Sequence, residues 1–487
     1  NCRNLNLDNT FIKLEGLRNL KYLDLSWSYH RKIPQNIKLL KNLEVLILDH
    51  NQLFEISEEI KNLKHLKIIS LKRNPSLKYE SLFKSLSSCT LKEIDLSYNY
   101  INNIPNSFYQ ISSLEKVNFT GNNISIIHES VSNLKALKEL DLSLNKNLDL
   151  KQSFNVLRSC PLENLRLENL KKQALPDEVS TLSNLKQLYL NHTPITELPK
   201  SIGSLTQLER FELAYNKNTG KLLILEKLPS SIGKLKNLKV LVLSGNKLSK
   251  IPKSLKELSN LEVLDLSMNE LTSFPDFIQF ITQVKFISLD HNKISEIPEW
   301  ISNFKNLEML LINSDLTHGY KFKIKTIPEN IGKLKNLKVL HLNDHVIEKL
   351  PESITELKEL EVLFIRNNLI SDLPDKIDQM KSLKALNVMA NELKNIPLSI
   401  ATLNNLKKLN LAFNPQIDFK LGSQVLSKMI NLEVLDISRN YIDPKLVKGL
   451  RAKLENTKVI YFPLKKYLME RPPNHIIKSL NDEQLSK

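Results

Sequence analysis

The sequence is poor in glycine and cysteine, and it has no long apolar run. Only 10 of its 487 residues are glycine and three are cysteine, which excludes a collagen-like fibre and a domain held together by disulfides. No window approaches the roughly 18 uninterrupted apolar residues that a membrane-spanning helix needs. Because 41% of the residues are hydrophobic, the chain has enough apolar material for a core and does not resemble a disordered protein.

Motifs of catalysis and cofactor binding are also missing. The sequence contains no glycine-rich phosphate loop, no G-x-S-x-G, no H-E-x-x-H and no Cys/His spacing typical of zinc. Cys89 and Cys160 occupy matched S-C-T-L and S-C-P-L contexts, and we expect them to be small core residues because free cysteine is usually buried. We therefore predict no enzyme activity, no cofactor and no metal site.

What the chain does have is a period. Residues 238–261 read L-x-x-L-x-L-x-x-N-x-L-x-x-I-P-x-x-L-x-x-L-x-x-L, and close copies recur along the whole sequence. Such self-similarity indicates a repeat architecture, which outweighs the several domains that length alone would suggest. Aligned on the second leucine, the copies form 18 units, most of them 23 residues apart, at Leu23, Leu46, Ile69, Ile94, Val117, Leu140, Leu165, Leu188, Phe211, Leu241, Leu264, Ile287, Leu310, Leu340, Leu363, Leu386, Leu409 and Leu435.

Each position of the unit has a physical interpretation. The alternating L-x-L predicts a short strand with one buried face, paired in parallel with its neighbours. The asparagine that follows, as at Asn122 or Asn292, can donate to and accept from backbone groups of adjacent turns. Pairs such as Ile251-Pro252 favour an extended return path, so we expect a thin outer layer of 3₁₀ turns and extended segments.

This unit resembles the 23-residue Leu-Pro class of leucine-rich repeat proteins, and the resemblance covers nearly the whole chain. The lysine-rich, glycine-poor composition is most similar to that of bacterial surface or secreted members. The resemblance implies an α/β fold, a curved right-handed solenoid with a concave parallel sheet, and a role in protein recognition.

The period predicts one solenoid domain over 1–462, followed by a cap and tail over 463–487. An atypical unit containing Leu5 and Leu7 precedes the repeats, and Thr457 to Phe462 reads as a closing strand. Three units are longer by two or three residues and contain the spacing of short amphipathic helices, within 82–89, 154–160 and 421–429. Two others run to 30 residues, and their insertions, 217–227 and 316–326, align with each other.

Charge is distributed in a regular way. The chain has a net charge of +16, and the residue after each unit's opening leucine is lysine in ten units and glutamate in eight, in near alternation. Parallel strands lie about 4.8 Å apart, so this column predicts a ladder of cross-strand ion pairs. The remaining positive charge is expected on the outer face. We find no stripe of aromatic residues interleaved with basic ones, so nucleic acid is disfavoured as a partner.

The residue that follows the index leucine, the third residue of each strand, is predicted to face outward from the sheet. Asp, Asn or Ser is the default there, and the exceptions mark candidate contacts because exposed apolar groups often indicate an interface. The exceptions fall in the repeats near 166 to 242 and 286 to 366. There the third strand residue is not Asp, Asn or Ser, or a neighbouring outward-facing residue is large and apolar or basic. The predicted partner-binding residues are Arg166, Tyr189, Val242, Phe286, Leu311, His341, Phe364 and Arg366. Leu170, Thr193, Asp315 and His345 replace the turn asparagine in the same regions.

The main hypothesis is a non-enzymatic protein, secreted or on the cell surface, that binds a host or cell-surface protein through its concave face. The alternative is an intracellular scaffold for signalling proteins. Binding of polyanions through a basic outer face and a hidden enzyme are the weaker alternatives. The sequence does not identify the partner, and a monomer is the default state.

Overall fold

A computed structural model describes residues 5–215, 225–314 and 323–463. The chain divides into two compact units, Asn1–Val240 and Leu241–Lys487, and the single domain over 1–462 stays a prediction. Cys2, the tail after 463 and most of both insertions lie outside the described residues.

Every index residue is the middle residue of a strand, which confirms the 18 repeats. Within each unit, consecutive strands pair in parallel and in register, as Leu188 does with Leu165 in the first unit and Leu310 with Leu340 in the second. The first unit contains β1 (Tyr22–Asp24), β3 (Val45–Ile47), β5 (Ile68–Ser70), β6 (Glu93–Asp95), β7 (Lys116–Asn118), β8 (Glu139–Asp141), β9 (Asn164–Arg166), β10 (Gln187–Tyr189) and β11 (Arg210–Glu212). β12 (Val240–Val242) spans the boundary, and the second unit contains β13 (Val263–Asp265), β14 (Phe286–Ser288), β15 (Met309–Leu311), β16 (Val339–His341), β17 (Val362–Phe364), β18 (Ala385–Asn387), β19 (Lys408–Asn410), β20 (Val434–Asp436) and β21 (Lys458–Ile460). The last of these is the predicted closing strand.

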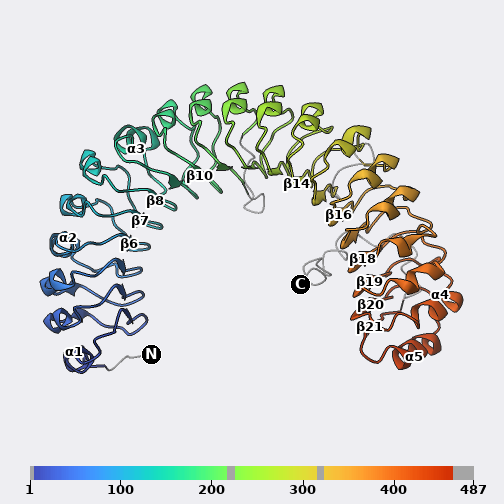
Figure 1. The fold of residues 1–487 in the computed structure, drawn as a ribbon, viewed down its shortest axis with the longest axis horizontal. Helices are drawn as coiled ribbons and strands as arrows, with labels where there is room; N and C mark the ends of the chain where they lie inside the picture. The colour runs from blue at the N-terminus through green and yellow to red at the C-terminus, as the bar shows by residue number, and fades with distance from the viewer. Residues whose placement is uncertain (1–4, 216–224, 315–322, 464–487) are drawn as a thin grey trace. The chain divides into compact units, whose positions relative to one another are not determined.

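The side opposite the strands is made of short 3₁₀ helices, as the Ile-Pro pairs predict. In each unit the strands line one side and these turns the other (Figure 1). Many begin directly after a proline with extended backbone, for example Pro252. The described turns are η1 (Gln35–Leu39), η2 (Glu58–Asn62), η3 (Asn106–Gln110), η4 (Glu129–Asn133), η5 (Asp177–Thr181), η6 (Lys200–Ser204), η8 (Ser230–Lys234), η9 (Lys253–Glu257), η10 (Asp276–Phe280), η11 (Glu299–Asn303), η13 (Glu329–Lys333), η14 (Glu352–Glu356), η15 (Ile377–Gln379) and η16 (Leu398–Thr402). A small parallel pair, β2 (Lys32–Ile33) and β4 (Glu55–Ile56), lies among the first turns.

The three long repeats carry α-helices on this same side, as predicted: α2 (Tyr79–Leu86), α3 (Leu150–Leu157) and α4 (Phe419–Leu426). The start of the chain differs from the expectation. Residues of the supposed atypical unit form a helix, α1 (Leu7–Glu15), because Asn6 caps it by accepting from the backbone N–H of Asn9. α5 (Pro444–Lys453), which has proline in its first turn, was not predicted.

The core consists of the repeated leucines and isoleucines, and the turn asparagines are buried with it. Asn122 shows their role: its Nδ2 donates to the carbonyls of Leu96 (3.0 Å) and Phe119 (2.8 Å), and its Oδ1 accepts from the backbone N–H groups of Asn99 (3.0 Å) and Ile101 (2.9 Å). One amide therefore satisfies four backbone groups in two successive repeats. The same pair of donations, to its own and the preceding repeat, is made by Asn51, Asn74, Asn99, Asn145, Asn269, Asn292, Asn368, Asn391, Asn414 and Asn440.

Two further expectations are confirmed. Glutamates and lysines of the predicted column pair across strands, for example Lys285 with Glu262 at 2.8 Å and Lys338 with Glu308 at 2.7 Å. Such exposed pairs are each worth only about 0–1 kcal/mol. Cys89 and Cys160 are buried core residues with free thiols.

Replacing Asn122 by alanine tests the asparagine ladder. The change leaves the buried N–H groups of Asn99 and Ile101 without their acceptor. The carbonyls of Leu96 and Phe119 keep a donor, from Asn99 and Asn145. Each unpaired group costs about 1–3 kcal/mol, so we expect a loss in the free energy of unfolding on the order of 3 kcal/mol. The neighbouring Asn123 is exposed, so Asn123→Ala is a matched control. Thermal melts and amide exchange around 96–122 measure both variants, and equal effects would contradict the assignment.

Candidate functional site: the outward strand residues

The third residue of each strand has a structural role that its default identity reflects. We name the residue two positions after this one the capping position. Where the third strand residue is Asp or Asn, its side-chain oxygen accepts from the backbone N–H of the capping position. The Oδ1 of Asp24 accepts from Ser26 at 2.8 Å, and that of Asp265 accepts from Ser267 at 2.9 Å. Asp95, Asn118, Asp141, Asn387, Asn410 and Asp436 do the same. The frequent Asp and Asn are therefore part of the scaffold.

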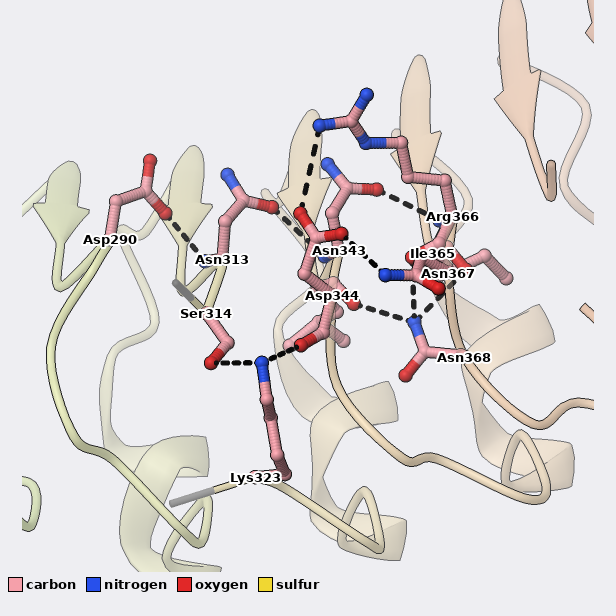
Figure 2. Close-up of polar contacts among 11 residues, drawn as sticks. Asp290, Asn313, Ser314, Lys323, Asn343, Asp344, Ile365, Arg366, Asn367 and Asn368 are labelled. Atoms are coloured by element: carbon pink, nitrogen blue, oxygen red, sulfur yellow. Dashed lines mark hydrogen bonds and ion pairs between the residues drawn. The ribbon is translucent and has the colours of Figure 1, made fainter. Parts of the chain in front are cut away.

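In three successive repeats whose third strand residue is not Asp or Asn, the preceding repeat supplies the acceptor. Asp290 accepts from the N–H of Asn313 (2.6 Å), Asn313 from that of Asn343 (2.9 Å), and Asn343 from that of Arg366 (2.8 Å). Figure 2 shows these residues in a row across successive repeats. The strands concerned end in Leu311, His341 and Phe364, which have no acceptor of this kind.

The first unit shows the same compensation twice in the predicted region. The capping N–H of Ala214 bonds to the Oδ1 of Asn191 at 2.9 Å, in the repeat whose strand ends in Glu212. The capping N–H of Glu168 bonds to the hydroxyl of Ser143 at 3.1 Å, in the repeat whose strand ends in Arg166. In the repeats of Arg166, Leu311, His341 and Phe364, an acceptor in the preceding repeat therefore keeps the capping N–H satisfied. This releases those side chains from the capping role, which is a condition for using them in recognition.

In the second unit the released side chains lie beside an apolar column. Phe286, Met309, Val339 and Val362, the first residues of four strands, are in register with one another and half-buried. Leu311 is half-buried in the adjacent column, and Val242 lies at the amino-terminal end of this unit. The structure thus brings Phe286, Leu311, His341, Phe364 and Arg366 onto neighbouring strands and turns of one unit.

His341 and Phe364 are stacked, with ring centroids 4.6 Å apart and planes 9° apart. Phe364 is only 1% exposed, so the expectation that it stands free in solvent is wrong, and the stacked imidazole is one cause. Burial, with a contribution from Arg366, lowers the pKa of His341 to about 4. The imidazole is therefore neutral at pH 7 and covers the phenyl ring as a largely apolar group.

In the first unit, Arg166 and Tyr189 lie on adjacent strands, and the guanidinium carbon is 3.9 Å from the centre of the tyrosine ring. Tyr189 is 8% exposed because it is covered in this way, so it too is less accessible than expected. Its hydroxyl donates to Gln187, and Arg210 pairs with Glu212 on the next strand at 2.7 Å. This patch is polar, in contrast with that of the second unit.

Two of the replaced turn asparagines keep the asparagine's bonds. Thr193 donates through Oγ1 to the carbonyl of Leu167 and accepts from the N–H of Leu170. His345 has Nε2 2.5 Å from the carbonyl oxygen of Ile312, and its Nδ1 accepts from the N–H of Ile324 at 3.2 Å. Both nitrogens of this buried ring are engaged, so it is a structural residue. Asp315 lies outside the described residues.

Arg366 and a buried lysine complete this region (Figure 2). The carboxylate of Asp344 lies 3.6 Å from Arg366 Nη2 and accepts from Asn367 at 2.9 Å. Lys323 is buried and donates through Nζ to the hydroxyl of Ser314 (2.9 Å) and the carbonyl of Asp344 (2.6 Å). These contacts hold the turns after β15 and β16 together beneath the outward residues.

Asp290 is the acceptor with the most unusual electrostatics. Burial raises its pKa from 3.8 to about 7, bonds from Asn313 oppose the shift, and the Asp265 carboxylate adds to it. Sequence reasoning missed Asp290, Asn313 and Asn343. The signal that could have found them is an Asp or Asn at the capping position of repeats whose third strand residue is neither Asp nor Asn.

The repeated parallel strands, asparagine ladder and 3₁₀ turns define a repeat solenoid in each unit. The chain is a leucine-rich repeat protein. Family models described as leucine-rich repeats match residues 315–482, 236–279, 89–146 and 184–205. Within the described residues, no helix has the length and apolar character needed to cross a membrane.

Several known proteins are similar. A leucine-rich repeat protein of Leptospira interrogans has a solved structure with a TM-score of 0.69 and 26% identity, covering 92% of this chain and 98% of that one. A plant peptide hormone receptor solved with RGF2 shares the fold, with a TM-score of 0.58, 21% identity and coverage of 92% and 78%.

Two curated relatives match over shorter stretches. A probable serine/threonine-protein kinase of Dictyostelium discoideum is 33% identical over 158 residues, which is 26% of this chain and 5% of that protein. The adenylate cyclase of Schizosaccharomyces pombe is 29% identical over 163 residues, 33% of this chain and 9% of that protein. The chain spans less than a tenth of either relative and resembles them only through the repeats, which are generally non-catalytic binding modules.

The raised pKa of Asp290 predicts how Asp290→Asn depends on pH. The folded protein retains a proton that the unfolded chain releases above pH 3.8, so the stability linked to this group is present below that pH and lost as pH rises through about 7. Asparagine keeps the acceptor for Asn313 without this loss. We expect Asp290→Asn to raise the melting temperature much more at pH 8 than at pH 4. The corresponding gain in the free energy of unfolding at pH 8 is at most roughly 4 kcal/mol.

Asp290→Ala is the matched control, because it removes the ionisable group together with the acceptor for Asn313. It should therefore melt at a lower temperature than Asp290→Asn at both pH values. Thermal melts at pH 4 and pH 8 give the comparison. An equal effect of Asp290→Asn at both would show that the group is not strained when ionised.

Proposed function

We propose that the chain is a protein-recognition module whose strand face binds a protein partner. The observation that carries this proposal is the coincidence of three features in the second unit. These are apolar side chains at the starts of four successive strands, loss of the polar default at the ends of three of these strands, and capping acceptors that compensate for that loss.

The half-buried residues Phe286 and Leu311 are the proposed apolar anchors, with Val242 at the edge of the same unit. His341 and Arg366 supply polar contacts, and Phe364 acts from below by supporting the His341 ring. Central apolar and aromatic groups with polar groups around them are typical of interface hot spots. The covered pair Arg166 and Tyr189 is the proposed contact of the first unit.

The proposed setting is secreted or on the cell surface, with a host or cell-surface protein as partner and a monomeric chain of one domain over 1–462. The support is the resemblance to bacterial members of the Leu-Pro repeat class. The alternative is an intracellular signalling scaffold. The coding sequence upstream of Asn1 distinguishes the two, since a secretion leader favours the first.

A double substitution, Phe286→Asp with Leu311→Asp, tests the surface. Both residues are half-buried and face outward, so the charges should remove apolar contacts with a partner while leaving the core leucines in place. We expect at least about a tenfold loss of affinity, as for hot-spot residues. Partners captured by the wild-type chain from extracellular and cytosolic fractions are then titrated by surface plasmon resonance.

Leu398→Asp is the matched control, because Leu398 is an exposed apolar residue on a 3₁₀ turn of the same unit. Unchanged binding by the double variant, or an equal loss with Leu398→Asp, would place the interface elsewhere.

A further inference from the structure

A second surface lies in the first unit, beside the strand face. The residue after each capping position, which we name the rim position, has a positive φ in most repeats, as at Trp27 (57°), His50 (53°) and Tyr98 (58°). Its backbone N–H bonds to the carbonyl of the capping residue in the next repeat: Trp27 to Asp49, His50 to Lys72, Arg73 to Ser97 and Tyr98 to Thr120. These bonds hold the rim side chains of four successive repeats in one column.

The column combines aromatic groups with cationic ones. Trp27 and His50 are stacked with ring centroids 3.7 Å apart. Arg73 lies 5.2 Å and Lys72 5.5 Å from the centre of the Tyr98 ring. Burial and then the charges of Arg73 and Lys72 lower the pKa of His50, against a smaller opposing effect of Asp49. Arg73 and Lys72 therefore place positive charge near both His50 and the Tyr98 ring.

The aromatic side chains also extend outward from the column. Trp27 is 57% exposed and Tyr100 69%, and Tyr29 and Phe54 are exposed as well. The turn segments 27–31, 50–54, 73–77 and 98–102 contain no acidic residue, whereas the equivalent segments of the next four repeats, 121–125, 144–148, 169–173 and 192–196, contain no Trp, Tyr or Phe. The concentration of aromatic residues is thus a property of these four repeats.

Two backbone features help to hold the aromatic side chains in this arrangement. Tyr29 and Tyr100 have positive φ values of 58° and 56°, which is strained for a bulky residue and is often found at binding sites. Gly121 lies against Tyr98, because a Cβ there would be 2.6 Å from the tyrosine ring. The glycine therefore leaves room for this ring.

We propose that this aromatic rim (Trp27, Tyr29, His50, Phe54, Arg73, Tyr98 and Tyr100) binds single-stranded nucleic acid. Exposed rings offer stacking platforms to unpaired bases, and neighbouring cations attract phosphates. Successive repeats present these groups about 4.8 Å apart, somewhat more than the 3.4 Å rise of a stacked strand, which suits a partly unstacked one. The nearby carboxylates Asp24, Asp49 and Asp95 are each engaged in a backbone hydrogen bond.

An acidic peptide shares the charge of a nucleic acid but lacks a planar ring at every residue. A duplex has its bases already stacked and offers no free faces. The rim residues lie 23 to 25 positions apart in the sequence, so a search for aromatic and basic residues interleaved along the chain does not find them.

Fluorescence anisotropy with fluorescein-labelled oligothymidylate and oligouridylate, titrated with the full chain at low salt, tests the proposal. We expect Trp27→Ala and Tyr100→Ala each to weaken binding by about tenfold, within the range for loss of one stacked base. Contacts to about three phosphates predict a slope of roughly −2 for log K against log salt. Arg73→Gln should make this slope shallower by about 0.7.

Matched controls are Phe280→Ala, an exposed aromatic on η10, and Lys428→Gln, an exposed lysine after α4; neither should alter binding. Thermal melts confirm that each variant is folded. The proposal is overturned by absence of binding at low salt, by equal losses in the control variants, or by tighter binding of a hairpin duplex. Competition by a glutamate–tyrosine copolymer as strong as that by the oligonucleotide would instead identify an acidic protein partner.

Discussion

The structure depends on one constraint: the backbone groups between successive turns are buried, and only the neighbouring repeats can satisfy them. Each strand at an index residue is three residues long, so ladder hydrogen bonds alone leave the following turn unpaired. A buried polar group without a partner costs more than a hydrogen bond contributes. The asparagine column meets this demand, and the side chains of Thr193 and His345 show that chemistry rather than residue identity is what counts.

The same constraint explains where the strand face is free to vary. An Asp or Asn at the end of a strand is held in place by the capping N–H of its own repeat. Once Asp290, Asn313 and Asn343 take over that bond, the residues at 311, 341 and 364 can be apolar or aromatic without leaving a buried donor unpaired. The variable strand ends and the acceptors in the preceding repeats therefore depend on each other. The cost of burying the carboxylate of Asp290 is part of this arrangement.

Much of the fold could be predicted from the sequence because its causes are local and periodic. The strand positions, the thin outer layer, the helices α2, α3 and α4, and the alternating Lys/Glu column all follow from residue spacing within one repeat. The acceptor roles of Asp290, Asn313 and Asn343 could not be predicted, because each side chain accepts from a backbone N–H 23 to 30 residues away. Helix α1 depends on the cap supplied by Asn6, in a segment whose leucines also fit the repeat.

Exposure was the least predictable property of the candidate site. The column position of Phe364 and Tyr189 indicates which way they face, but not that His341 and Arg166 cover them. The rim position differs in kind, because its anchor is the backbone N–H and any side chain compatible with positive φ leaves that bond intact. Variation at the ends of β15, β16 and β17 is accompanied by compensation in another repeat, whereas variation at the rim needs none. A rim surface can therefore change its binding chemistry one residue at a time while the strand face beside it keeps its own.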